Sequence, residues 1–145
     1  MTPPSERPAD RAAAPGDVVV ALCTAPASAA EDLARAVVGE RLCACVNALP
    51  GVVSHFVWDG RVDRAEEVLL VIKTTRAALP RLQARLVDLH PYDVPEVLVL
   101  EARDGHEPYL QWVRDSVADA GAGTPAPGIR DAGSPGVDLA GGAAE

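Results

Sequence analysis

The sequence predicts a domain of the α+β class, in which one antiparallel four-stranded sheet carries two helices on one face. Along the chain, apolar residues follow the periods of strand, helix, strand, strand, helix, strand and helix, in that order. An Asp59–Gly60 pair is a two-residue turn that joins the second and third strands into a hairpin. This order is the split βαβ pattern, to which the last helix is an addition.

Composition predicts one domain between two tails. Residues 1–16 and 119–145 are rich in Pro, Ala, Gly and charge without periodicity, so we expect a disordered arm (1–16), a domain (17–118) and a disordered tail (119–145). A net charge of −8 without a basic run argues against a nucleic-acid partner. No apolar run approaches the roughly 20 residues of a membrane span. Three cysteines without a C-x-x-C pair, and no apolar leader, favour reduced thiols in the cytoplasm.

The first strand and helix follow from local signals. Residues 17–24 hold a short run of Val, Ala and Leu bounded by Gly and Pro, which is typical of a buried strand. Ser28 and Glu31 match a capping box and predict the start of the first helix. Its apolar stripe ends near 39–42 and consists of Ala30, Leu33, Val37 and Val38.

The middle of the chain predicts a long hairpin. Residues 44–58 are extended, and Pro50–Gly51 should bend or bulge that strand. The return strand begins polar at Arg61 and becomes apolar from Val68, ending at 73–75. Cys43 and Cys45 are two residues apart, so we expect them to share one face, either as small core residues or as a chelating pair.

The last third predicts helix, strand and helix. The second helix carries Leu at 79, 82, 86 and 89, with Pro80 in its first turn. His90 and Tyr92 then stand on a short connector stiffened by two prolines, which leads into a buried strand at 96–100. Pro108 starts a third helix, whose apolar side consists of Tyr109, Trp112, Val113 and Val117.

The hairpin is too long for its domain. Each arm of about 14 residues spans about 45 Å, whereas a domain of 100 residues has a radius of gyration near 13 Å. Its outer part keeps apolar residues such as Val57, Trp58 and Val62. We infer a homo-oligomer in which hairpins or sheet edges pair between subunits. The alternative is a shorter hairpin that packs these residues on its own sheet.

The chain resembles the CutA family of divalent-cation-tolerance proteins over residues 18–117. The matching segments are VVVALCTAP (18–26), ERLCACVN (40–47), LPG (49–51), WDG (58–60), KTT (73–75), HPY (90–92), PE (95–96) and YLQW (109–112). The resemblance implies a ferredoxin-like fold and a homotrimer similar in architecture to the PII signalling proteins. It also implies a cytoplasmic protein linked to tolerance of copper and other divalent metals, and no agreed enzymatic activity comes with it.

The same resemblance implies metal ligands. A cysteine at the end of the first strand maps onto Cys23, and two adjacent histidines map onto Leu89 and His90, of which leucine cannot ligate. Thiolate and imidazole together suit Cu²⁺ or another divalent cation such as zinc. Two ligands leave a tetrahedral site incomplete, so a neighbour in the trimer would supply carboxylates such as Asp93 or Glu96. The alternative for Cys23 is a buried core thiol.

A second hypothesis uses polar and aromatic groups as a small-ligand cleft. In a trimer, an intersubunit pocket for a small anion would be lined by Trp58, Lys73, Thr74, Tyr92 and Glu96. Lys73 has the alternative role of a strand-end lysine paired with a carboxylate. The sequence holds no Gly-rich phosphate loop, nucleophile elbow or metalloprotease motif, so we expect no enzymatic activity.

Overall fold

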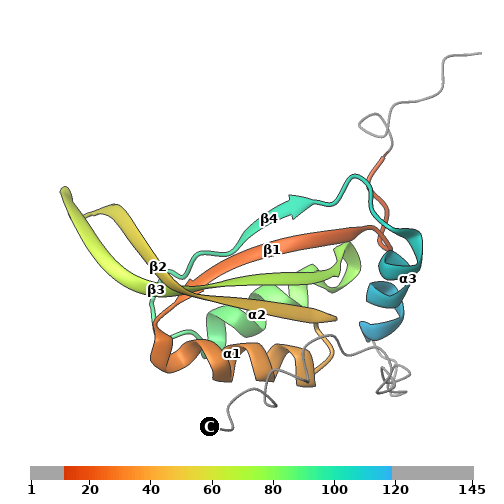
Figure 1. The fold of residues 1–145 in the computed structure, drawn as a ribbon, viewed down its shortest axis with the longest axis horizontal. Helices are drawn as coiled ribbons and strands as arrows, with labels where there is room; N and C mark the ends of the chain where they lie inside the picture. Colours follow the sequence, from red (N-terminus) through yellow and green to blue (C-terminus); the bar gives the residue numbers. More distant parts are fainter. Residues whose placement is uncertain (1–11, 119–145) are drawn as a thin grey trace, which may run out of the picture.

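The computed structural model describes residues 12–118, and the order of its elements confirms the predicted one (Figure 1). The elements are β1 (Val18–Ala25), α1 (Ala27–Gly39), β2 (Cys45–Trp58), β3 (Arg61–Thr75), the short 3-10 helix η2 (Arg76–Ala78), α2 (Leu79–Leu89), β4 (Leu98–Glu101) and α3 (Glu107–Ser116). Within this described part, no helix is long and apolar enough to cross a membrane.

The four strands form one antiparallel sheet in the order β2-β3-β1-β4. Both α1 and α2 lie on the same side of this sheet, while α3 lies at one end of it (Figure 1). The α+β class and the split βαβ order are therefore confirmed.

Alternation along the strands divides the sheet into two faces. In β3, Leu70 and Ile72 are fully buried against the helices, where Leu82 and Leu86 of α2 meet them. The residues between them point the other way, because successive side chains of a strand face opposite sides. We call this second side the open face, and its apolar residues are Val20, Leu22, Leu69, Val71, Leu98 and Leu100.

The hairpin extends beyond the rest of the sheet, as predicted (Figure 1). Its register shifts between Leu49 and Val52, which confirms the bulge at Pro50–Gly51. Asp59 and Gly60 have φ values of 52° and 75°, which are the left-handed values that a two-residue turn of a hairpin requires. The tip exposes the apolar residues Val57 (74%), Trp58 (63%) and Val62 (78%).

The predicted capping box is wrong. The first helix begins at Ala27, after Pro26 as its N-cap, and no side chain caps it. The carbonyl of Pro26 accepts hydrogen bonds from Ala29 and Ala30 instead, at 2.9 and 3.1 Å. Ser28 consequently lies inside the first turn, where its hydroxyl is too late in the sequence to act as the N-cap.

The last strand is an exposed edge, whereas the sequence predicts a buried strand there. It pairs with β1 alone. Leu98 and Leu100 are 54% and 49% exposed, because they lie on the open face, whereas Val97 and Val99 pack on the core. An apolar run of this length does not tell which of its sides another element will cover.

The ends of the predicted domain are only partly described. The chain is already bound to the domain before residue 17: Ala77 N–H donates to the carbonyl of Pro15 at 2.9 Å, and Arg114 Nε donates to that of Gly16 at 3.0 Å. The predicted arm therefore does not extend to residue 16. The rest of that arm, at 1–11, and the predicted tail at 119–145 lie outside the described residues.

Candidate functional site

The two predicted metal ligands both approach the carbonyl oxygen of Thr24, close to the ends of β1 and α2. Cys23 Sγ lies 3.8 Å from the carbonyl oxygen of Thr24, and His90 Nε2 lies 2.8 Å from the same atom. Both side chains are buried: Cys23 is fully buried, and His90 is 7% exposed. The fold thus places a thiol and an imidazole around one oxygen, although they are far apart in the sequence. Because Cys23 also belongs to the hydrophobic core, its packing matches the alternative interpretation, and its role as a ligand stays a prediction.

Local backbone geometry fixes the position of His90. Pro91 prevents α2 from continuing, so His90 turns to an extended conformation while its N–H still donates to Leu86 at 2.9 Å. The backbone N–H of Tyr92 lies 3.1 Å from His90 Nδ1 and can only donate, so Nδ1 is the acceptor. Nε2 therefore carries the proton and donates a hydrogen bond to the carbonyl oxygen of Thr24. A metal ion at Nδ1 would replace the hydrogen bond from Tyr92, whereas a metal ion at Nε2 would also require the proton there to leave or to move to Nδ1.

A buried carboxylate stands beside this pair. Glu67 is 7% exposed and accepts a hydrogen bond from the phenol of Tyr92 at 3.0 Å, and the Tyr92 ring lies 4.7 Å from that of His90. Burial raises the pKa of Tyr92, and the hydrogen bond to Glu67 and its charge add to the effect. Burial also raises the pKa of Cys23 to about 11, with smaller contributions from the charges of Glu96 and Glu67. Cys23 is therefore a protonated thiol at neutral pH.

The donors suit a divalent metal in type, but one chain does not complete the site. Among residues 12–118, no three His, Cys, Asp or Glu side chains are placed to hold a metal ion. Leu89, onto which the resemblance maps a further expected ligand, is an apolar side chain that is 37% exposed and cannot bind a metal. Metal binding at Cys23 and His90 therefore requires loss of the thiol proton, rupture of a hydrogen bond, and further ligands.

A groove of about 910 Å³ opens between the outer hairpin and the connector after α2. Trp58, Tyr92 and Glu96, three of the residues expected in an intersubunit cleft, line this groove within one chain, and Glu67 forms part of its wall. Lys73 and Thr74 are not part of it within one chain. Lys73 lies six positions along the extended strand from Glu67, which amounts to roughly 20 Å.

Thr74 and Lys73 have other partners. Thr74 is fully buried, and its hydroxyl donates to the carbonyl of Leu42 at 2.7 Å. Lys73 Nζ lies 3.9 Å from Cys45 Sγ, so it contacts a thiol and not the carboxylate of its alternative interpretation. The prediction that Cys43 and Cys45 share a strand face is wrong, because Cys43 is buried ahead of the strand while Cys45 begins it and is only partly buried.

The charge of the groove is opposite to that needed for an anion. Four carboxylates line it, and no Lys or Arg does: Asp63, Glu67, Asp93 and Glu96. The sequence prediction overlooked Glu67, although a signal was present. Glu67 immediately precedes Val68, where the strand becomes apolar, and a carboxylate at the start of a buried run needs a partner.

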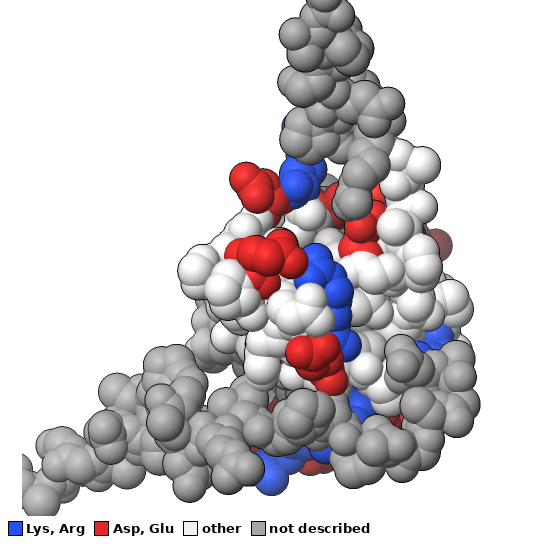
Figure 2. All heavy atoms as spheres, turned by 90° about the vertical axis from the view of Figure 1, so that its right-hand side faces the viewer, with Lys and Arg blue, Asp and Glu red and all other residues white. Residues whose placement is uncertain are grey.

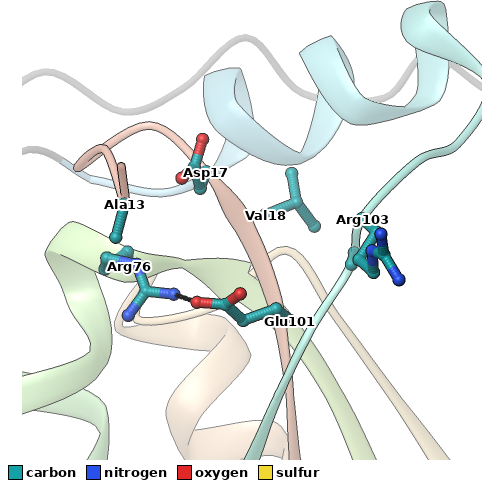
Figure 3. Close-up of a pocket in the computed structure, with 7 residues that line it drawn as sticks. Ala13, Asp17, Val18, Arg76, Glu101 and Arg103 are labelled. Carbon is teal, nitrogen blue, oxygen red and sulfur yellow. Dashed lines mark hydrogen bonds and ion pairs between the residues drawn. The ribbon is translucent and has the colours of Figure 1, made fainter. Parts of the chain in front are cut away.

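The opposite end of the molecule holds a smaller cavity of about 290 Å³ beside Arg76, Glu101 and Arg103. Arg76 and Glu101 pair with each other across it, and Arg103 lies to one side (Figure 3). At this end, acidic and basic side chains are interspersed, with Arg114 and Glu107 forming another ion pair (Figure 2). Neither the cavity nor this face offers a concentrated charge of one sign.

The chain matches the family described as CutA1 divalent ion tolerance protein over residues 18–116. It is 45% identical over 98 residues to the divalent-cation tolerance protein CutA of Thermus thermophilus, a match that covers 67% of this chain and 95% of that protein. A solved structure of a divalent cation tolerance protein (Cut A1) from Thermus thermophilus superposes with a TM-score of 0.68 at 43% identity, covering 70% of this chain and 99% of the other. A structure of a PII-like protein CutA from Nostoc, in apo form, gives 0.63 at 36% identity, covering 66% and 92%.

Proposed function

Since this chain belongs to the CutA1 divalent ion tolerance family, we propose that it is a ferredoxin-like homotrimer that binds Cu²⁺ or another divalent cation at Cys23 and His90. The observation that carries the proposal is the approach of Cys23 Sγ and His90 Nε2 to one carbonyl oxygen. Glu67 and Glu96 act electrostatically on the same thiol and supply negative charge beside it. Sulfur and imidazole donors favour copper or zinc over magnesium or calcium.

Binding at this site is expected to release a proton. The thiolate is the form of cysteine that binds metal, and burial raises the pKa of Cys23 to about 11. Between neutral pH and that value, each rise of one pH unit should therefore strengthen binding by about tenfold. Coordination through His90 Nε2 would also require the proton on Nε2 to move to Nδ1, so the hydrogen bonds to Thr24 and from Tyr92 would both be lost in the same step.

A competition titration tests the proposed ligands. Zn²⁺ and Cu²⁺ are titrated against a chromophoric chelator in the wild-type protein and in Cys23→Ser and His90→Ala. Both substitutions should abolish binding, whereas Cys45→Ser and His106→Ala remove a thiol and an imidazole elsewhere and should leave it unchanged. Unchanged metal affinity in Cys23→Ser would rule out the site.

The proposed trimer rests on two apolar surfaces that a single chain leaves uncovered. One is the open face of the sheet, and the other is the hairpin tip with Val57, Trp58 and Val62. Burying such surfaces between subunits is favourable by about 25 cal/mol per Å². The number of three subunits comes from the family resemblance.

Light scattering tests this assembly with a matched pair of variants. Val62→Asp places a carboxylate on the hairpin, and Val87→Asp places one on α2, where the side chain is 51% exposed. We expect Val62→Asp to dissociate the oligomer and Val87→Asp to leave it intact. A wild-type protein that scatters as a single chain would contradict the proposal.

A second candidate function is that of a sensor or interaction protein without enzymatic activity, whose groove takes a small ligand. The groove of about 910 Å³ favours it, because this volume far exceeds that of an ion and the walls include Trp58 and Tyr92. Its four carboxylates favour a cationic ligand over the anion expected from the sequence. A thermal-shift screen separates the two candidates: stabilisation by an organic cation that persists in Cys23→Ser supports the sensor. In either case we propose a cytoplasmic protein, in keeping with its free thiols.

A further inference from the structure

Cys45 and Lys73 form a pair of nucleophilic groups that the metal proposal does not use. They stand directly opposite each other in the β2·β3 ladder, and Lys73 Nζ lies 3.9 Å from Cys45 Sγ. Directly opposed residues of antiparallel strands point to the same face, which here is the open face. Cys45 is the one cysteine of the three that is not buried, and Lys73 is the only lysine in the sequence.

The surroundings keep the amine next to the sulfur. Within the described residues, Lys73 makes no ion pair with a carboxylate, so the polar partner of its amine is Cys45. Asn47 Oδ1 lies 3.9 Å from the same sulfur. Tyr109 of α3 is near enough to Cys45 to interact with it electrostatically. Burial raises the pKa of Tyr109, and the charge of Cys45 raises it further. Lysine has a flexible stem, so its nitrogen can reach the sulfur without movement of the backbone.

From this geometry we propose that Cys45 and Lys73 are a redox modification site, at which peroxide joins the two side chains through a reversible sulfur–nitrogen bond. Hydrogen peroxide first oxidises the thiol by two electrons to a sulfenic acid, and its O–O bond breaks to release water. The neutral amine of Lys73 then attacks the sulfur. The S–O bond breaks, and the oxygen leaves as a second water with one hydrogen from the attacking nitrogen. The product is a sulfenamide, which a thiol reductant returns to free thiol and amine.

This bond would join β2 to β3 at the base of the hairpin. Sulfenic acids condense with nearby nitrogen nucleophiles, and that reaction protects the sulfur from irreversible oxidation to sulfinic or sulfonic acid. Cys23 and Cys43 are buried and less accessible to peroxide. Oxidation should therefore be selective for Cys45.

Intact-mass and amine-labelling measurements on the full chain in its native assembly test the proposal. After one equivalent of hydrogen peroxide added to the native assembly, the wild-type protein should lose the mass of two hydrogen atoms, and Lys73 should lose nearly all its reactivity towards an amine reagent added after the chain is unfolded. Dithiothreitol should restore both.

Two variants separate this bond from other products. Lys73→Arg keeps the positive charge but removes the amine, so with a second equivalent of hydrogen peroxide Cys45 should proceed to sulfinic acid in it. Cys43→Ser should still form the bond. A loss of two hydrogens that persists in Lys73→Arg would identify a disulfide and overturn the proposal. So would a wild-type protein whose Lys73 stays fully reactive after oxidation.

Discussion

Replacing His90 by alanine removes two hydrogen bonds that hold the connector after α2 against β1. Thr24 loses the donor at 2.8 Å, and the N–H of Tyr92 loses its acceptor at 3.1 Å. A neutral hydrogen bond contributes about 1 kcal/mol, and buried partners left unsatisfied cost more. Because His90 is only 7% exposed, water can replace the ring only in part. We expect a loss of about 2–3 kcal/mol in the free energy of unfolding, which lowers Tm by roughly 10–20 °C for a domain of this size.

Urea unfolding followed by circular dichroism measures this loss. All variants are compared at one protein concentration, because an oligomer's stability depends on it. The adjacent Leu89→Ala is the control, since its side chain is 37% exposed and makes no polar contact, and it should cost about 1 kcal/mol or less. A His90→Ala protein within about 0.5 kcal/mol of wild type would show that the two hydrogen bonds do not stabilise the connector.

Three further predictions concern the core, the glycines and pH. Leu82→Ala removes a fully buried side chain and should cost about 2–5 kcal/mol in chemical unfolding; a loss under about 1 kcal/mol would mean that the core is loosely packed. Gly60→Ala should destabilise the protein by about 1 kcal/mol or more, because φ is +75° there, whereas Gly39→Ala has open space around it and should be neutral or stabilising; equal effects would contradict the turn geometry. Burial raises the pKa of Cys23 to about 11 and that of Cys43 to about 12, from an ordinary value of 9.0. The folded state thus holds these protons more tightly than the unfolded chain, so stability should be complete below pH 9 and fall as pH rises towards 11 and 12; a flat profile in thermal melts over that range would refute this.

Local patterns were enough to predict the elements but not what covers them. Pro50–Gly51 and Asp59–Gly60 fix a bulge and a turn through their own backbone preferences, so both were predictable. The exposure of Leu98 and Leu100 depends on which face the helices cover, which is a property of the whole sheet. The period of apolar residues does not indicate this exposure, because an apolar strand has the same sequence pattern whether or not another element covers it.

The candidate site shows the same limit. Cys23 and His90 were predicted as metal ligands from the resemblance to the CutA family, and the fold brings both to one carbonyl oxygen. Lys73 was expected to supply an ammonium to a cleft between subunits, and within one chain the length of β3 places it at the far end of the sheet from Trp58 and Tyr92. Glu67 was overlooked because it ends a polar stretch, although its place just before the buried run at Val68 was a signal, and its partner Tyr92 is far away in the sequence.

Native mass spectrometry with and without copper tests the central claim most directly, because it reports subunit number and bound metal together. We predict a particle of three chains that gains copper in the wild type and gains none in Cys23→Ser. A particle of one chain, or equal copper uptake by the Cys23→Ser protein, would contradict this prediction.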